Sequence, residues 1–449
     1  MFYVLTESAH KPSSDPLVWN MNGGPGCSTI GGWWLSEGGP LVPVANGSLV
    51  VNPYSYNNFA NVLYVDSPVG VGFSTTSNSS TAYSNEQTAV DNLTFLRLFL
   101  EQHSEFKSRD LHLVGESFAG YYIPQLAVKI LDAIDAETLD VKLAGLQVGN
   151  ACTDGAIDTN GTYVQLFNMA FNSHATFSAV QQHCNFSAPY TSQECEAAIA
   201  QSSAEVGGTV DLYDLFENDC PAQQSRNHQL AFARVPGPVG AAHRSRLASQ
   251  LGMLERDPTS LLQRLERDQE RMRESRTAVG SADPPQTDPC IDNIVSAYLN
   301  RNDTQRALGI IGEDEWHMWW FSCSPKVAME WPAADLMADV RPLYTQIFAK
   351  NVPVLVYSGG VDDIVPYAGT RVWTEQMGGT PVHAWQPWTV TPIGKKSPVV
   401  GGYVTEYDNF SFVVVRGAGH MVPATQPAAA LHMAEAFVAN GTLVEKKRT

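Results

Sequence analysis

The chain has 449 residues, 44% of them hydrophobic, so it is long enough to bury a large core in one to three domains. Its formal net charge of −18 argues against a nucleic-acid partner, because no basic surface is available to bind phosphates. No apolar run reaches the roughly 18–20 residues that a membrane-spanning helix needs.

The first informative stretch is an apolar run at residues 17–19 that leads into Asn-Gly-Gly-Pro-Gly-Cys-Ser at residues 22–28. Glycine amides can approach a substrate closely and stabilise a tetrahedral oxyanion, an effect of about 3 kcal/mol for each donor. Glycine also supplies the positive φ that a tight turn needs. Both interpretations can hold at once.

A second apolar run, residues 111–114, is followed by Gly-Glu-Ser-Phe-Ala-Gly at residues 115–120 and by a helix-like segment. A serine on a sharp strand-to-helix turn between small residues is typical of a nucleophile elbow. Ala119 stands where the usual Gly-x-Ser-x-Gly has its second glycine. The hexapeptide alone is a weak signal, so Ser117 is a candidate nucleophile that needs partners elsewhere.

The middle of the chain has a different character, because the alternation of strands and helices gives way to helical pieces with cysteines. We predict a first core segment at residues 1–151, a helical cap insertion at 152–335 and a second core segment at 336–449. Within the insertion, residues 223–285 are rich in Arg, Gln, Glu, Pro and Ser, and we predict a flexible linker there.

Two apolar runs near the C-terminus end in glycine-rich turns. Residues 354–358 lead to Gly-Gly-Val-Asp-Asp, which contains Asp362 and Asp363, and residues 412–415 lead to Arg-Gly-Ala-Gly-His, which ends at His420. Ligands of open α/β sheets bind beyond the carboxyl ends of the strands. The chain order Ser, Asp, His is that of the α/β-hydrolases, so we predict that fold with a mostly parallel central sheet.

Each of these residues also has a simpler interpretation. Asp362 and Asp363 suit a solvated turn, and His420 is one of eleven histidines, which taken singly are usually structural. Three strand ends that carry Ser, Asp and His favour a catalytic triad over coincidence.

With these motifs in place, the chain resembles the serine carboxypeptidase family of the carboxypeptidase Y and cathepsin A type. The resemblance covers almost the whole chain in family order. It rests on Asn-Gly-Gly-Pro-Gly-Cys-Ser (22–28), Glu-Gly-Gly-Pro (37–40), Asp-Ser-Pro-Val-Gly-Val-Gly-Phe-Ser (66–74), Gly-Glu-Ser-Phe-Ala-Gly (115–120), the segment of Asp362 (354–366) and Arg-Gly-Ala-Gly-His-Met-Val-Pro (416–423).

The resemblance implies a role for each site residue by its motif. Ser117 would be the nucleophile, His420 the base and Asp362 the orienting acid. The oxyanion donors would be the amides of Gly24 and Phe118. Phe118 replaces the commoner tyrosine, which matters little if only its amide is used.

The acid position departs from the family pattern. Gly360 stands where the usual Gly-Asp-x-Asp stretch has its first acid, so Asp362 loses an acidic neighbour. Asp363 remains a competitor of Asp362 for the role, with less support from the motif.

The resemblance also implies that Asn22, Glu37 and Glu116 bind the C-terminal carboxylate of a substrate. The substrate carboxylate would join Glu37 and Glu116, and three acidic groups in one pocket cannot all stay ionised, so this carboxyl cluster must share protons. Binding should weaken as the pH rises, which predicts activity in acid even though a histidine base works better near neutral pH. The alternative for Glu116 is a structural acid at the elbow.

Seven cysteines without a Cys-x-x-Cys pair favour disulfides over zinc, although their spacing does not fix the pairing. The resemblance implies the pairs Cys27–Cys323, Cys184–Cys195 and Cys220–Cys290, with Cys152 free. We expect no metal and no cofactor.

The sequence further predicts a glycoprotein of the secretory pathway, located in a vacuole or lysosome or outside the cell. Eight Asn-x-Ser/Thr sequons occur, at Asn46, Asn78, Asn92, Asn160, Asn185, Asn302, Asn409 and Asn440. We expect no glycan at Asn409, because it enters an apolar strand. No signal peptide precedes residues 1–3, which begin near an early strand, so we expect the true N-terminus to lie upstream.

The leading function is release of C-terminal residues from peptides or proteins through an acyl-enzyme. The alternatives are an acyltransferase of the same fold, disfavoured by Asn22 and Glu116, and a non-catalytic relative, disfavoured by the complete triad.

In some relatives the linker is excised. Residues 243–246 and 271–273 are candidate cleavage sites here, and the alternative is an uncut surface loop. The tryptophans Trp316, Trp319 and Trp320 line a pocket or belong to the core. Side-chain preference and oligomeric state, including a homodimer, stay open.

Overall fold

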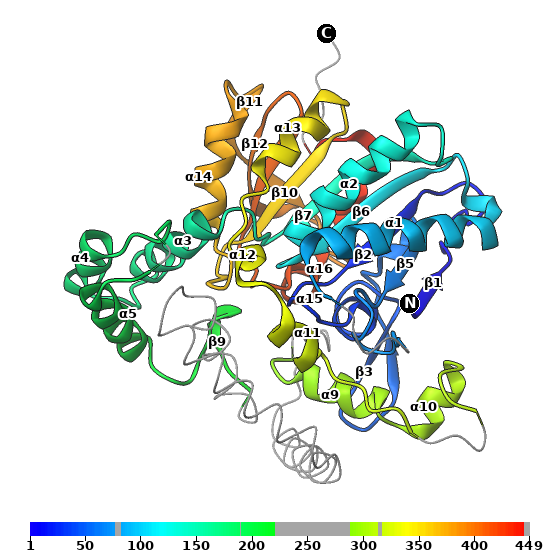
Figure 1. Ribbon diagram of the computed structural model, residues 1–449, viewed down its shortest axis with the longest axis horizontal. Helices are drawn as coiled ribbons and strands as arrows, with labels where there is room; N and C mark the ends of the chain where they lie inside the picture. The colour runs from blue at the N-terminus through cyan, green and yellow to red at the C-terminus, as the bar shows by residue number, and fades with distance from the viewer. Residues whose placement is uncertain (77–81, 189, 221–287, 313–316, 444–449) are drawn as a thin grey trace.

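The computed structural model describes residues 1–76, 82–188, 190–220, 288–312 and 317–443 (Figure 1). The predicted linker and both candidate cleavage sites, as well as Asn78 and Trp316, lie outside these residues. The division of the chain after residues 151 and 335 stays a prediction.

A nine-stranded sheet forms the centre of the molecule, with the strand order β1-β5-β2-β6-β7-β10-β13-β12-β11. The six strands from β5 to β13 are parallel, while β1 at one edge and β12 and β11 at the other are antiparallel to their neighbours. In sheet order, the strands are Tyr3–Thr6, Asn61–Val65, Leu17–Met21, Asp110–Glu116, Lys142–Gly149, Val354–Gly359, Phe410–Val415, Val399–Glu406 and His383–Val390. The predicted α/β-hydrolase fold with a mostly parallel sheet is confirmed.

The central strands are apolar because helices cover both faces of the sheet. Every residue of β2, β5, β10 and β13 is buried. On one face, side chains of β6 such as Leu113 pack with α1 (Asn85–Gln102), α2 (Ala119–Asp135) and α13 (Arg341–Ala349). On the other face, His112 meets Phe437 of α16 (Pro427–Asn440).

The remaining elements connect or extend this core. Helices α3, α4 and α5 follow β7, and α4 and α5 project away from the sheet (Figure 1). The other helices are α3 Gly155–Asn168, α4 His174–His183, α5 Gln193–Val206, α9 Ile291–Leu299, α10 Asn302–Ala307, α11 Pro325–Glu330, α12 Ala333–Leu336, α14 Tyr367–Gly378 and α15 Val422–Thr425, with short turns η1 Ile30–Trp34, η2 Tyr56–Asn58 and η3 Ser104–Phe106. Two small hairpins pair β3 (Leu41–Pro43) with β4 (Leu49–Val51) and β8 (Val210–Asp211) with β9 (Asp214–Asn218).

The structure has three disulfides, and they are the pairs that the resemblance implied; two of them join segments 296 and 70 residues apart, and the third closes a loop over 11 residues. The structure contains Cys27–Cys323, Cys184–Cys195 and Cys220–Cys290, and Cys152 is buried and forms no disulfide.

Within the described residues, no helix is long and apolar enough to cross a membrane.

The sequons differ in accessibility, which corrects the expectation for Asn92 and leaves the one for Asn409 a prediction. Asn92 is fully buried and accepts a hydrogen bond of 2.7 Å from Ser67, so its sequon cannot carry a glycan in the folded protein. Asn409 is exposed just before β13, so burial does not exclude a glycan there. Asn160 is half-buried, and the exposed sequons besides Asn409 are Asn46, Asn185, Asn302 and Asn440.

Trp320, for which the sequence left both a pocket and the core open, belongs to the core. It is 1% exposed, and a Cβ on Gly31 would lie 2.4 Å from its ring. Trp319 is half-buried, with its ring centroid 4.6 Å from that of His317.

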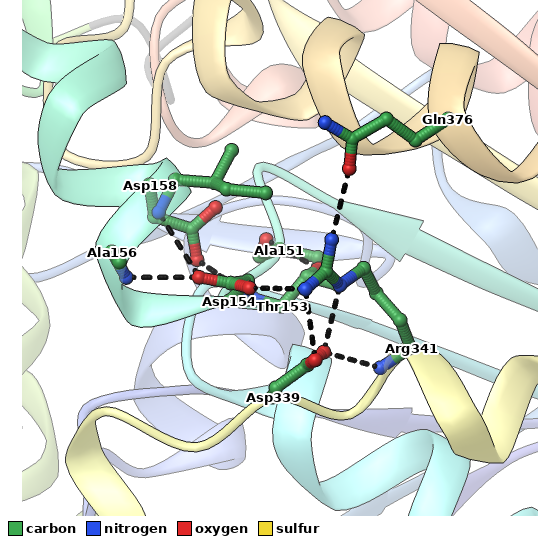
Figure 2. A network of polar contacts seen from close by, with 9 residues as sticks. Ala151, Thr153, Asp154, Ala156, Asp158, Asp339, Arg341 and Gln376 are labelled. Atoms are coloured by element: carbon green, nitrogen blue, oxygen red, sulfur yellow. Dashed lines mark hydrogen bonds and ion pairs between the residues drawn. The ribbon is translucent and has the colours of Figure 1, made fainter. Parts of the chain in front are cut away.

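Arg341 links three helices through a network of polar contacts (Figure 2). Its guanidinium donates to Asp154 at the start of α3 (2.6 Å), to Asp339 just before α13 (2.8 Å) and to Gln376 of α14 (2.9 Å). These hydrogen bonds fix the start of α3, which follows β7, against α13 and α14.

We predict that Arg341→Met, which keeps the apolar stem and removes the donors, lowers the free energy of unfolding by about 1 kcal/mol at pH 6, since the network is partly solvent-exposed. Arg341 lowers the pKa of Asp339 below its usual 3.8, so this contribution is present above about pH 4 and is lost as the pH falls further. Urea unfolding at pH 6 and pH 3 measures it.

Lys350→Met is the control, because Lys350 pairs with Asp135 in an exposed position and its loss should change little. Equal stability of Arg341→Met and the wild type at pH 6 would contradict the prediction.

Candidate active site

Ser117 stands on a strained turn between β6 and α2. Its φ is +60°, in the left-handed region that residues other than glycine rarely adopt, as a nucleophile elbow requires. Glycine is needed on both sides: a Cβ at Gly115 would lie 2.5 Å from the carbonyl oxygen of Met21, and one at Gly120 would lie 2.4 Å from that of Cys152. Ala119, the departure from the usual motif, fits at 0% exposure.

His420 and Asp362 meet in the loops that follow β13 and β10. Nδ1 of His420 lies 2.9 Å from Oδ2 of Asp362, and the two side chains are 2% and 0% exposed. Asp363, the competitor, makes no hydrogen bond to His420 within the described residues; its Oδ1 is buried without a partner, and burial together with the charge of Asp362 raises its pKa well above the usual value. The structure therefore brings Asp362, and not Asp363, to the histidine.

The imidazole of His420 is held in one orientation. The backbone N–H of His420 donates to the carbonyl of Tyr213, between β8 and β9, at 2.6 Å. The tyrosine ring meets the imidazole edge to face, with the ring centroids 5.1 Å apart. With Nδ1 bound to Asp362, the other nitrogen, Nε2, has no hydrogen-bond partner among the described residues, Ser117 included. Hydrogen bonds of this kind are often long before a substrate binds.

The glycine-rich loop lies directly against the elbow. A Cβ on Gly23 would lie 2.5 Å from the amide nitrogen of Phe118 and 2.6 Å from Cβ of Ser117. Gly24, with φ +114°, follows at once. The amides of Gly24 and Phe118 thus belong to two backbone segments in contact beside Ser117, and Phe118 also begins the positive end of α2.

Glu37 and Glu116 form a buried carboxyl pair next to the elbow. Each is 2% exposed. Burial raises the pKa of Glu116 to about 7, although the electrostatic influence of His420 works in the opposite direction. Burial, together with the charge of Glu116, raises the pKa of Glu37 well above its usual value. The pair therefore retains a proton in acid, and Glu116 lies within electrostatic reach of the histidine.

Asn22 completes the predicted carboxylate-binding set, and its amide is fixed by the backbone around it. Oδ1 accepts from the N–H of Gly23 at 2.8 Å, and Nδ2 donates to the carbonyl of Ser28 at 3.1 Å. The backbone of η1 packs on the amide, because a Cβ on Gly32 would lie 2.0 Å from Nδ2.

Among the described residues, no group of three or more His, Cys, Asp and Glu side chains could hold a metal ion.

Sequence reasoning missed three residues of this site. Asn150 donates to Oδ2 of Asp362 at 2.6 Å, and Tyr213 holds His420. Neither lies in a motif that signals its role, since both act through contacts between distant segments. Gly23 could have been found, because it is the neighbour of Gly24 in the same glycine-rich stretch.

The sheet, with a serine elbow after β6 and an Asp–His pair after β10 and β13, defines an α/β-hydrolase. The family model described as serine carboxypeptidase matches residues 1–440. The chain belongs to the serine carboxypeptidase family.

Relatives match over nearly the whole chain. Serine carboxypeptidase-like 22 of Arabidopsis thaliana is 33% identical over 448 residues, which cover 99% of this chain and 87% of that protein. Serine carboxypeptidase 24 of the same plant is 32% identical over 451 residues, covering 99% and 86%. The crystal structure of Kex1(Δ)p, a prohormone-processing carboxypeptidase of Saccharomyces cerevisiae, is similar in fold, with a TM-score of 0.70 at 19% identity and coverage of 99% and 88%.

We predict that Gly23→Ala lowers the rate of p-nitrophenyl acetate hydrolysis about 100-fold, because the methyl group would push the glycine-rich loop away from the amide of Phe118. Gly208→Ala is the matched control, since a Cβ at Gly208 meets nothing within 4 Å. A Gly23→Ala protein within threefold of the wild-type rate would contradict this assignment of the loop.

Proposed function

We propose that this protein is a serine carboxypeptidase that releases C-terminal amino acids from peptides and works best in acid. The observation that carries the proposal is the buried pair Glu37 and Glu116 beside Ser117. A pair that retains a proton can donate a hydrogen bond to the carboxylate at the end of a peptide, and Asn22 lies in the adjoining loop.

In this proposal the triad supplies acyl-transfer chemistry. Ser117 attacks the last peptide carbonyl, and Nε2 of His420 takes the serine proton, while Asp362 stabilises the imidazolium that forms. The amides of Gly24 and Phe118 stabilise the tetrahedral oxyanion. His420 then protonates the leaving amino group, and water releases the acyl chain from Ser117 by the reverse sequence.

We also propose that the protein folds in the secretory pathway and acts in a vacuole or lysosome or outside the cell. Three disulfides and several exposed sequons support an oxidising compartment. An acidic compartment suits the protonated carboxyl pair.

The first test is release of free amino acid from an N-blocked dipeptide. We expect faster release at pH 5 than at pH 7.5, and a loss of at least about 1,000-fold in Ser117→Ala. Absence of release by folded wild-type protein would reject the carboxypeptidase proposal. Transfer of an acyl group from an activated ester to an alcohol, without hydrolysis of the dipeptide, would establish an acyltransferase instead.

The second test isolates binding from chemistry in the Ser117→Ala protein. The pKa of Glu116 is raised to about 7, so Glu116 loses its proton as the pH rises past that value, and the more negative pair then repels the substrate carboxylate. We predict that the Kd of the N-blocked dipeptide rises about tenfold between pH 5 and pH 8. Titration calorimetry measures it.

Replacing Glu37 and Glu116 together with Gln in the Ser117→Ala protein should leave a Kd that changes less than about threefold over this range. Glu101→Gln, at an exposed position of α1, is the control and should keep the original dependence. If the double variant kept the original pH dependence of the Kd, groups other than Glu37 and Glu116 would be responsible for binding the substrate carboxylate.

A further inference from the structure

Asn150 lies between the strand that leads to Ser117, β6, and the strand that leads to Asp362, β10. It directly follows β7, which lies between β6 and β10 in the sheet. Its φ is +41°, in the left-handed region that asparagine tolerates better than most residues, and it is 0% exposed. Its backbone N–H donates to the carbonyl of Tyr357 in β10 at 2.8 Å.

The side-chain amide of Asn150 has only one orientation that satisfies its neighbours. Oδ1 accepts from the backbone N–H of Gly359 at 3.0 Å, and Nδ2 donates to Oδ2 of Asp362 at 2.6 Å. Rotating the amide by 180° would set an oxygen against the carboxylate and a donor against the N–H of Gly359. The amide is therefore locked with its donor toward Asp362.

Asn150 is the sole side chain other than His420 that donates to Asp362 within the part of the chain that the structure describes. The carboxylate also accepts from the N–H groups of Ile364 (2.8 Å, to Oδ1) and Val365 (3.1 Å, to Oδ2). Those two donors belong to the loop of Asp362 itself and move with it. Asn150 is anchored in the sheet, so it fixes the carboxylate relative to the strands.

The same segment contacts the nucleophile. The N–H of Ser117 donates to the carbonyl of Gly149, and the N–H of Cys152 donates to the carbonyl of Ser117, each at 3.0 Å. Residues 149–152 thus touch the elbow through their backbone and the acid through the side chain of Asn150. No other described segment hydrogen-bonds to both Ser117 and Asp362.

We propose that Asn150 is a positioning residue of the triad, which holds the carboxylate of Asp362 against Nδ1 of His420 at a fixed place relative to Ser117. The inference rests on the proposed function only in assuming that this triad acts on substrates. Asn150 touches no reacting atom, so its loss should slow the chemical step and leave substrate binding unchanged.

The experiment compares Asn150→Gly and Asn150→Asp with the wild type. Glycine accepts the positive φ without strain and removes the amide. Aspartate keeps the shape and the acceptor for Gly359 but sets a second buried carboxyl against Asp362, so the two share a proton at pH 5 and Asp362 loses part of the charge that stabilises the imidazolium of His420. Asn351→Gly is the matched control, because Asn351 also has a positive φ (+56°) but is exposed on a turn after α13. The readouts are kcat and KM for an N-blocked dipeptide at pH 5, the rate at which a fluorophosphonate labels Ser117, and the thermal unfolding midpoint.

We expect both Asn150 variants to fold, to lose about 10- to 100-fold in kcat and in labelling rate, and to keep KM within about threefold. The unfolding midpoint of Asn150→Gly should stay within a few degrees of the wild type, and Asn351→Gly should retain full activity. A kcat of Asn150→Gly within threefold of the wild type overturns the proposal. Failure of both variants to fold also overturns it, because Asn150 would then be structural.

The labelling rate separates this inference from the proposed function. If the wild type reacts with the fluorophosphonate at Ser117 but releases no amino acid, the carboxypeptidase proposal fails. The effect of Asn150→Gly on labelling still decides the role of Asn150.

Discussion

The close approach of the two loops that leave β10 and β13 is the constraint on which the site depends. A Cβ on Gly359 would lie 1.9 Å from the carbonyl oxygen of Gly419, so only glycine lets the loops meet. The N–H of Gly360 then donates to Val415, continuing the strand pairing one residue beyond β10. Because the strands are parallel and adjacent, the residues that follow them emerge at the same edge, and Asp362 reaches His420.

The carboxyl pair is a second consequence of burial at this edge. Glu116 is the last residue of β6, and Glu37 follows the tight turn η1, so two acids from separate segments are forced into one dry pocket. Their raised pKa values follow from that placement and not from the residue types. The proposed preference for acid and the proposed recognition of a free C-terminus therefore share one physical cause, the cost of ionising both carboxyls.

Much of this arrangement was predictable from the sequence, because buried parallel strands appear as continuous apolar runs and their ends as glycine-rich turns. The order of Ser117, Asp362 and His420 followed from that pattern. That pattern alone did not decide between Asp362 and Asp363, which only the family motif separated, since adjacent acids in a turn differ only in the directions that tertiary packing gives them. Asn150 was not predictable because its partner lies 212 residues away, and the burial of Asn92 depends on its contact with Ser67.

The proposed function requires that the site bind the free carboxylate at the end of a peptide. The most direct measurement compares kcat/KM at pH 5 for an N-blocked dipeptide that ends in a free carboxylate with that for the same dipeptide ending in an amide. We predict a preference of at least about 100-fold for the free acid, because only the free carboxylate can accept a charge-assisted hydrogen bond from the protonated pair Glu37 and Glu116. Equal values for the two substrates would contradict it.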